Sequence, residues 1–278
     1  MEIIENKTFD QERALYGSRE IILRNCSFDG PADGESALKE SEEVLADGCF
    51  CNLRYPFWHI SRLIITDTEM TGLCRAAIWY SRYIKINNSK LYGIKALREC
   101  SNITITGCDI RSPEFGWSVT NITMKDTDVS GEYFMMRSGN LRFSNVTLNG
   151  KYSFQYVYNG EFDGCNFDTK DAFWHGKNIV IRDSVIKGEY FAWYSDGLTL
   201  INCKISGTQP FCYCRNLKLV NCELTGADLS FEKSEADADI ITHVDSIKNP
   251  ASGTIRVPSV GEIIMDDENA HGEIVTDR

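Results

Sequence analysis

A repeat of nineteen residues is the feature that most limits how this chain can fold. The pattern apolar-x-apolar-x-(Asn/Asp/Gly)-x-x-apolar recurs along the sequence, for example as LIITDTEM, ITITGCDI and IVIRDSVI. We take the fifth position of each copy as an anchor, and the last seven gaps between anchors are all nineteen residues. The anchors are Asn25, Gly48, Asp67, Asn88, Gly107, Asp126, Asn145, Gly164, Asp183, Asn202 and Asn221. A fixed period of this kind is typical of repeat architectures.

The residues around each anchor predict a short strand followed by a tight bend. Apolar residues stand four and two positions before most anchors and alternate with polar ones, which indicates a strand with one buried face. Asn, Asp and Gly tolerate the left-handed backbone conformation that a tight bend requires. Nineteen residues are too few for a strand–helix–strand crossover of ~30 residues. Leucine-rich repeats have a similar period, but their leucine spacing is absent.

The period therefore predicts an all-β fold, a single-stranded right-handed parallel β-helix, or solenoid, of about eleven or twelve coils. We expect one domain over residues 1–278. Within it, residues 1–20 would cap the first coil, 21–234 would form regular coils, 235–265 irregular terminal strands, and 266–278 an acidic tail. Solenoids need such closing segments because a free strand edge and an open core end are exposed otherwise.

Composition restricts the partners and the compartment. Asp and Glu total 40 against 29 Lys and Arg, a net charge of −11, which disfavours nucleic acid and anionic membranes. No run of roughly 18 apolar residues predicts a membrane span. The N-terminal segment does not resemble an export signal, so the eleven cysteines are interpreted as reduced, mostly buried thiols of a cytoplasmic protein. Cys49-Phe-Cys51 has the wrong spacing for zinc, so we expect no metal and no cofactor.

All five tryptophans fall nine residues before an anchor, in one column of the repeat. The column just before them is apolar and is expected to point inward, which turns the tryptophans outward. Aromatic rings beside charged residues suit a sugar chain, because C–H faces stack on rings and hydroxyl or uronate groups meet charged side chains. The candidate substrate-binding residues are Trp58, Trp79, Trp117, Trp174, Trp193, Tyr194, Tyr213, Arg54, Arg75 and Lys151. Alternatively, these side chains fill and cover wide coils without a ligand.

His175 is the best placed histidine for chemistry. Lys170 and Asp171 share its predicted coil, and Glu189 lies on the next. A base close to a cation and a carboxylate can abstract a proton or protonate a leaving group. His175, Glu189, Lys170 and Asp171 are therefore the candidate catalytic residues. An imidazole held in a polar stack without any reaction is the more common arrangement and stays open.

Several longer stretches are similar to a known family. GESALKES (34–41), RYPFWH (54–59), TKDAFWH (169–175) and GEYFAWYS (188–195) resemble a bacterial family of pectin-lyase-like right-handed β-helix proteins that is catalogued as a domain of unknown function. The resemblance implies the same β-helix. The wider superfamily implies carbohydrate chemistry, by lyases and hydrolases, and also includes non-catalytic modules. The adjacent-aspartate and Gly-His-Gly signatures of its polygalacturonase-like hydrolases have no match within the repeat.

Two functions follow as hypotheses. The first is a carbohydrate-active β-helix protein that binds an oligo- or polysaccharide along an aromatic and charged outer face, either as a polysaccharide lyase or glycoside hydrolase or without turnover. The second is a non-catalytic structural or protein-binding scaffold, with self-association into a homo-oligomer as one form of it. Whether the protein is an enzyme stays open at the level of the sequence.

Overall fold

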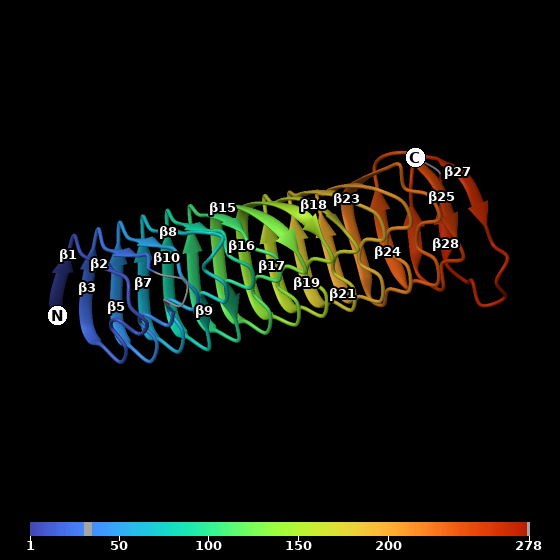
Figure 1. Cartoon of the computed structure of the whole chain (residues 1–278). Coiled ribbons are helices and arrows are strands. Elements are labelled where there is room, and N and C mark those ends of the chain that lie inside the picture. Colours follow the sequence, from blue (N-terminus) through green and yellow to red (C-terminus); the bar gives the residue numbers. More distant parts are fainter. Residues whose placement is uncertain (31–34, 277–278) are drawn as a thin grey trace. The chain divides into compact units, whose positions relative to one another are not determined.

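A computed structural model describes residues 1–30 and 35–276 of the chain (Figure 1). Two compact units, Met1–Gly139 and Asn140–Arg278, divide the chain, and each is described by itself. That they form a single domain stays a prediction. Gly34 of the GESALKES motif and residues 277–278 of the predicted tail lie outside the described residues.

The first unit is built from parallel strands joined by turns. Corresponding strands of successive coils pair in register, so that Ile84 pairs with Leu63 on one side and with Ile103 on the other. Its strands are β1 (Glu2–Glu5), β2 (Thr8–Phe9), β3 (Arg19–Arg24), β4 (Ser27–Phe28), β5 (Glu42–Asp47), β6 (Phe50–Cys51), β7 (Ser61–Thr66), β8 (Glu69–Met70), β9 (Ile78–Trp79), β10 (Arg82–Asn87), β11 (Lys90–Leu91), β12 (Leu97–Arg98), β13 (Ser101–Thr106), β14 (Asp109–Arg111) and β15 (Thr120–Glu132).

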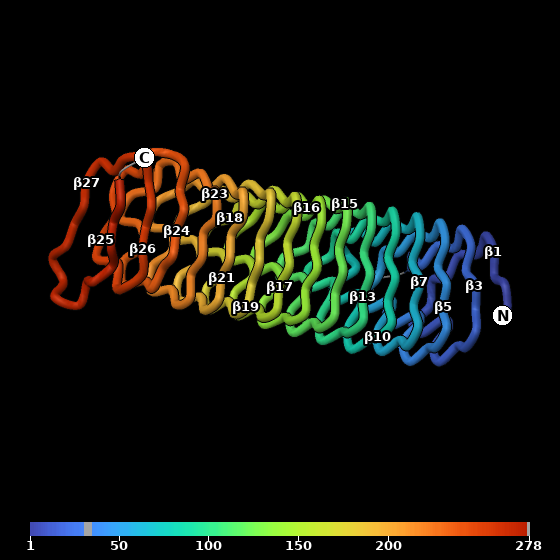
Figure 2. Tube along the Cα trace, turned by 180° about the vertical axis from the view of Figure 1, so that it is seen from behind, coloured from blue at the N-terminus to red at the C-terminus, as the bar shows by residue number. Residues whose placement is uncertain are grey.

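The second unit continues the same construction, and Figure 2 lets its coils be followed along the Cα trace. Ile181 pairs with Phe162 and with Leu200, nineteen residues away on either side. Its strands are β16 (Gly139–Lys151), which begins at the unit boundary, β17 (Tyr158–Asp163), β18 (Asn166–Lys170), β19 (Lys177–Arg182), β20 (Val185–Lys187), β21 (Asp196–Ile201), β22 (Lys204–Ser206), β23 (Leu217–Thr225), β24 (Ala236–Ile240), β25 (Val244–Lys248), β26 (Thr254–Arg256), β27 (Val260–Ile264) and β28 (Glu273–Val275).

The predicted apolar columns form the core of each unit. Leu63, Ile65 and Ile86 are fully buried or nearly so in the first unit. In the second, the rings of Phe154 and Phe173 stack at 4.6 Å and are both fully buried. Stacked large side chains fill a coil interior because each coil repeats the position of the one before it.

Every anchor has the left-handed backbone conformation predicted for it. The φ angles are 49° at Asn25, 62° at Gly48, 46° at Asp67, 48° at Asn88, 65° at Gly107, 49° at Asp126, 52° at Asn145, 57° at Gly164, 49° at Asp183, 54° at Asn202 and 51° at Asn221. Some polar anchors also bond along the column: Asn221 Nδ2 donates to Asn202 Oδ1 at 2.9 Å, and Asn202 Nδ2 donates to Asp183 Oδ1 at 3.0 Å. The bend residues thus help to hold successive coils together.

The ends of the repeat differ from the expectation. Residues 1–20 contain β1 and β2, which pair with β3 and β4, so this segment forms a coil, with Asn6 at a φ of 54° in the anchor position. Glu2 stands four residues before Asn6, where later copies carry an apolar residue such as Ile21. This polar residue hid the first coil in the sequence. In the predicted acidic tail, β28 pairs with β26.

The coil number was therefore underestimated. Among the described residues, the strand that precedes each bend occurs seven times in the first unit, as β1, β3, β5, β7, β10, β13 and β15. It occurs eight times in the second, as β16, β17, β19, β21, β23, β24, β26 and β28. The fold class itself, an all-β right-handed parallel β-helix, is confirmed.

Candidate functional site

The five tryptophans lie at the surface of their coils, as the alternation predicts. Each indole is half-buried, whereas the residues just before Trp58, Trp79 and Trp174 are fully buried. The residue that follows each tryptophan is exposed, for example His175 after Trp174 and Tyr194 after Trp193. The tryptophans thus border solvent without standing fully in it.

Neighbouring side chains along the coil stack cover ring faces of Trp79, Trp117, Trp174 and Trp193, whereas Trp58 meets Trp79 edge-on. Trp174 and Trp193 stack on one another at 5.4 Å with an interplanar angle of 5°. In the first unit, the Arg98 guanidinium lies between Trp79 and Trp117, 5.1 Å and 5.3 Å from the two rings. Cation–π and ring stacking therefore occupy these faces. A ligand approaching from solvent meets mainly ring edges.

The indole N–H groups are also engaged within the protein. In four of the five tryptophans, Nε1 donates to a backbone carbonyl sixteen residues further along the chain. The bonds run from Trp79 to Lys95 (2.7 Å), Trp117 to Tyr133 (2.7 Å), Trp174 to Tyr190 (2.8 Å) and Trp193 to Gln209 (2.8 Å). Gln155, in the same column, donates to the Asp171 carbonyl at 3.3 Å in the same way. The column therefore ties each coil to the next turn, which is a structural task.

Three of the predicted catalytic residues form a separate group. Lys170 Nζ lies 2.8 Å from Glu189 Oε2 and 5.1 Å from the Tyr190 ring. Asp171 is buried beside this pair. Desolvation raises the pKa of the Asp171 carboxyl and the Glu189 charge adds to the rise, although the nearby Lys170 opposes both. Lys170 is thus engaged in an ion pair with Glu189, which is itself one of the candidate catalytic residues.

His175 belongs to a ladder of stacked rings. Its imidazole lies between Tyr156 and Tyr194, with ring centroids 4.9 Å and 5.0 Å away and interplanar angles of 8° and 9°. Tyr213 extends the ladder, 4.8 Å from Tyr194. Because the ring faces cover one another, solvent reaches mainly the ring edges; Tyr156, His175 and Tyr194 are exposed and Tyr213 is half-buried. We call Tyr156, His175, Tyr194 and Tyr213 the ring ladder.

An open hollow of about 510 Å³ lies against the ring ladder in the second unit. We call it the wall hollow. It is lined by His175, Lys177, Tyr194, Ser195, Asp196, Tyr213, Cys214, Arg215, Lys233 and Glu235. Polar edges of the ring ladder thus face the same space as five charged side chains.

A column of alternating charge runs through the wall hollow. Lys177 pairs in register with Asp196, and Asp196 with Arg215, so the three stand on successive coils. Asp196 Oδ1 accepts a hydrogen bond from Asn216 Nδ2 at 2.8 Å. Within residues 1–30 and 35–276, neither Lys177 nor Arg215 has a side-chain hydrogen bond or an ion pair. These two cations are therefore available to a ligand. Our sequence analysis missed them, although the nineteen-residue steps from Lys177 to Asp196 and from Asp196 to Arg215 were visible.

The predicted site residues are thus divided among several places. His175, Tyr194 and Tyr213 line the wall hollow, whereas Lys170, Asp171 and Glu189 do not. Lys151 Nζ lies 5.5 Å from the Tyr152 ring. In the first unit, Arg54 pairs with Glu35 at 3.2 Å, and Arg75 is exposed. Trp58, Trp79 and Trp117 also belong to the first unit. The binding and catalytic roles of all these residues stay predictions.

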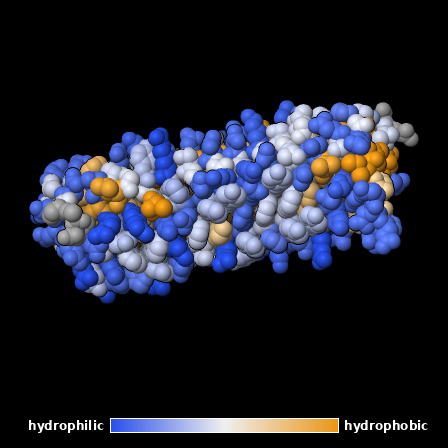
Figure 3. Space-filling model, turned by 45° about the vertical axis from the view of Figure 1, so that its right-hand side comes forward, coloured by the Kyte–Doolittle hydropathy of each residue, from blue (hydrophilic) through white to orange (hydrophobic). Residues whose placement is uncertain are grey.

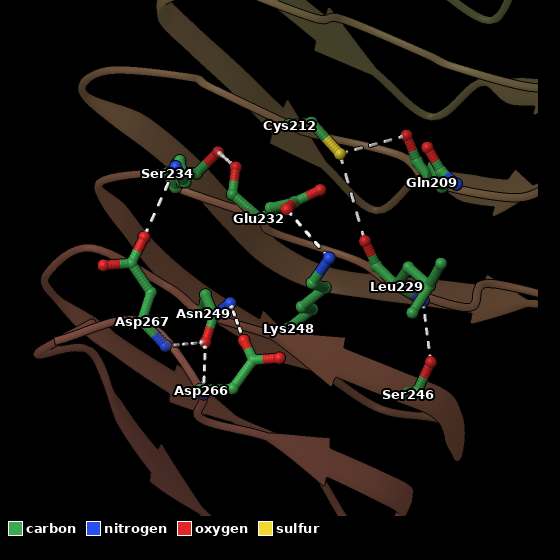
Figure 4. Close-up of polar contacts among 11 residues, drawn as sticks. Gln209, Cys212, Leu229, Glu232, Ser234, Ser246, Lys248, Asn249, Asp266 and Asp267 are labelled. Atoms are coloured by element: carbon green, nitrogen blue, oxygen red, sulfur yellow. Dashed lines mark hydrogen bonds and ion pairs between the residues drawn. The ribbon is translucent and has the colours of Figure 1, made fainter. Parts of the chain in front are cut away.

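A second charged hollow, of about 540 Å³, lies near the C-terminal end of the second unit (Figure 4). Each of its two lysines is paired: Lys248 Nζ is 3.0 Å from Glu232 Oε1, and Lys233 Nζ is 3.3 Å from Asp267 Oδ2. Asp266 and Glu268 leave the hollow with an excess of negative charge. Bonds from Asn269 and the Lys233 charge lower the pKa of the Asp267 carboxyl. Among the residues that the structure describes, no group of three or more His, Cys, Asp or Glu is placed to hold a metal ion.

The family match decides which group of proteins this chain falls into. It extends over residues 2–276, nearly the whole chain, and the family is described as "Protein of unknown function (DUF3737)". The chain belongs to this family. No curated protein matches it. In the part of the chain that the structure describes, no helix is long and apolar enough to cross a membrane.

Solved structures of similar fold are distant from this DUF3737 protein. The surface adhesin PfbA of Streptococcus pneumoniae is 9% identical with a TM-score of 0.41, over 87% of this chain and 80% of that chain. The Azotobacter vinelandii mannuronan C-5 epimerase AlgE4 A-module is 9% identical with a TM-score of 0.33, over 97% and 86%. A GH87 alpha-1,3-glucanase catalytic domain is 12% identical with a TM-score of 0.26, over 98% and 63%. They are an adhesin and two carbohydrate-active proteins; our fold assignment rests on the strand register.

Figure 3 shows one face of the molecule, which is mainly hydrophilic with hydrophobic side chains gathered in small areas. Exposed aromatic side chains of the ring ladder contribute to the surface of the second unit: Tyr156 and Tyr194 are both exposed. A wall of this composition is suited to a polar ligand with some apolar C–H surface.

Proposed function

We propose that this protein binds an oligosaccharide or polysaccharide bearing hydroxyl and carboxylate groups in the wall hollow of the second unit. The observation that carries the proposal is the pair of unpartnered cations, Lys177 and Arg215, beside the exposed edges of the ring ladder. In contrast, the nearby Lys170 is paired with Glu189 at 2.8 Å. Charged groups left without partners at a polar hollow are available for charge-assisted hydrogen bonds.

The repeat suits a ligand that also repeats. Lys177 and Arg215 are separated by two interstrand spacings, roughly 10 Å, along the coil stack. Successive sugar units lying along the stack would meet similar edges of His175, Tyr194 and Tyr213 on successive coils. A linear chain can therefore make the same type of contact several times, and multiple weak contacts add to a useful affinity.

Binding without turnover is the form of the proposal that the geometry favours. Lys170 and Glu189 neutralise each other and do not line the wall hollow, so the specific cation and carboxylate that the sequence placed beside His175 do not share its hollow. The cytoplasmic location suggested by the sequence is part of the same proposal. A lyase or hydrolase activity would appear as new chain ends when uronate oligomers are incubated with the full chain.

The test is a glycan array of neutral and uronate oligosaccharides, followed by calorimetric titration with the best ligand. We expect a Lys177→Ala/Arg215→Ala double variant to weaken uronate binding at least tenfold, about 1.4 kcal/mol. Lys187→Ala/Lys218→Ala is the matched control, because it removes two exposed cations from the same unit outside the wall hollow. Absence of glycan binding, or equal affinity of the two double variants, contradicts the proposal.

A further inference from the structure

A stripe of aliphatic side chains runs across the outer face of the first unit. Ile3, Ile22, Leu45 and Ile64 occupy the same outward register position on β1, β3, β5 and β7, which follow one another in Figure 1. We call these four residues the aliphatic stripe. Ile3 is 53% exposed and Ile64 37% exposed, and the other two are partly exposed.

The stripe is unusual for its position in the sheet. On the next strands the same outward column continues as Lys85, Thr104 and Thr123. Polar residues are the rule on a sheet face that meets water, because the alternation places apolar residues inside. Four adjacent outward aliphatics form a contiguous patch, and patches of this kind mark interaction surfaces more often than isolated exposed residues do.

Ion pairs border the stripe on both sides. Arg62 bonds to Glu43 and to Glu42 on one flank, each at 2.7 Å, and Arg24 pairs with Glu5 at 3.1 Å on the other. A groove of about 320 Å³ lies over the β5–β7 end of the stripe, lined in part by Leu45, Ile64 and Tyr83. An apolar centre within a charged rim is the usual anatomy of a protein–protein interface.

We propose that the aliphatic stripe is the surface on which a second copy of this chain docks, sheet face against sheet face. A two-fold axis parallel to the strands and midway between β5 and β7 reverses the order of the coils. Leu45 then faces Ile64 of the partner subunit, and Glu43 faces Arg62 of the partner subunit, and the symmetry repeats both contacts. This surface is separate from the wall hollow, and the inference goes beyond the proposed function.

Charge complementarity favours a second copy as the occupant. A net charge of −11 makes two copies repel on average, so a self-contact requires a locally balanced surface. Glu43 on β5 and Arg62 on β7 occupy positions that the two-fold axis exchanges. The carboxylate of each copy therefore faces the guanidinium of the other. Sheets that pack face to face at ~10 Å bury Leu45 and Ile64 from both sides, and set Ile22 and Ile3 against Lys85 and Thr104 of the partner subunit.

Sedimentation equilibrium of the full chain tests this arrangement. We expect a dimer whose dissociation constant rises about 100-fold or more in Ile64→Lys, because a charge would be buried at the centre of the contact. Thr123→Lys places the same charge on the same column, beyond the strands that the two-fold axis brings together, and leaves the dimer unchanged. Ile64→Thr, which copies the residue found at Thr104, covers the case in which Ile64→Lys fails to fold, and also weakens the dimer.

A charge-reversal experiment tests the contact between Glu43 and Arg62 separately. Arg62→Glu weakens the dimer because it opposes Glu43 of the partner subunit, and adding Glu43→Arg restores it. A wild-type chain that stays monomeric to about 100 μM, well above the range of a specific contact, overturns the proposal. So does a dimer that persists in both Ile64 variants, and so does equal dissociation by Ile64→Lys and Thr123→Lys.

Discussion

At the scale of single residues, the tryptophan column shows how one position can hold a coil in place. Its indoles stack along the coils and donate Nε1 to turn carbonyls, and Gln155 makes the same bond with an amide. Trp58 is the exception, because its Nε1 is buried without a partner among the described residues. A donor in this position contributes about 1 kcal/mol when it is bonded and costs a similar amount when it is not.

This difference gives a prediction within the first unit. Trp79→Phe removes the bond to the Lys95 carbonyl, whereas Trp58→Phe removes an unpaired donor and a similar ring volume. We therefore expect the free energy of unfolding to fall by about 1 kcal/mol or more in Trp79→Phe relative to Trp58→Phe. Urea denaturation measures both. Equal losses in the two variants would mean that the indole bonds do not stabilise the coils.

Asp171 gives a prediction about pH. Desolvation raises its folded-state pKa above the ordinary 3.8. At pH values between 3.8 and the raised pKa, the folded state therefore binds more protons than the unfolded chain. Its contribution to stability is therefore present at low pH and is lost as the pH rises through the raised pKa. Asp171→Asn removes this loss and also suits the left-handed φ of 54°.

The measurement compares unfolding midpoints of wild type and Asp171→Asn at about pH 7 and about pH 3. We expect the variant to be the more stable protein near neutrality and the two to converge in acid. A variant that is destabilised at neutral pH would show that the Lys170 charge outweighs desolvation at this carboxylate. Asp168→Asn, an exposed neighbour on β18, controls for removal of a surface charge.

At the scale of elements, the bends and the close contacts between neighbouring coils decide which residue types each position tolerates. Gly188 has a φ of 142°, and a Cβ there would overlap the Thr169 carbonyl oxygen of the preceding coil. Gly164 has a φ of 57° and open space around its Cα. Both are glycines at bends, but only the first needs the absence of a side chain.

Gly188→Ala is therefore expected to lower the free energy of unfolding by about 1–3 kcal/mol, through backbone strain and displacement of the neighbouring coil. Gly164→Asn is the control, because Asn already occupies this anchor position at Asn145 and Asn202 with similar φ angles. We expect that variant to be close to wild type in a thermal melt. A tolerant Gly188 would indicate that the coils can separate locally at little cost.

The elements also show what the sequence can and cannot predict. A fixed period with alternating polarity is enough to place Ile65, Ile86 and the anchors, because each depends only on local backbone preference and on burial. The orientation of the Trp174 and Trp193 rings depends on the distance between neighbouring coils, and no spacing in the chain expresses it. The last coils were obscure for a related reason: β24 and β26 pair at a seventeen-residue offset, so the nineteen-residue register no longer applies.

At the scale of the whole molecule, the solenoid gives every cysteine the same kind of environment. All eleven are free thiols, and all are buried. Burial raises the pKa of the Cys49 thiol to about 11 and that of Cys100 to about 12. Cys203 lowers the pKa of Cys222 by bonding to it, but Cys222 is fully buried. Burial therefore limits access to all eleven thiols in the folded state, and because the thiolate is the reactive form, the raised pKa values of Cys49 and Cys100 oppose their reaction further.

Titration with a thiol-specific disulfide reagent tests this environment. We expect fewer than about one thiol per chain to react in the folded protein at neutral pH, and all eleven to react in guanidinium chloride without any reductant. Reductant should leave the melting temperature unchanged, because the structure contains no disulfide among its eleven cysteines to be lost. Fewer than eleven reactive thiols in denaturant would reveal disulfides and argue against the reduced, cytoplasmic state that we propose. Rapid reaction of several thiols in the folded protein would show instead that the coils open often enough to admit the reagent, which a stack of coils held by ring ladders and anchor bonds should prevent.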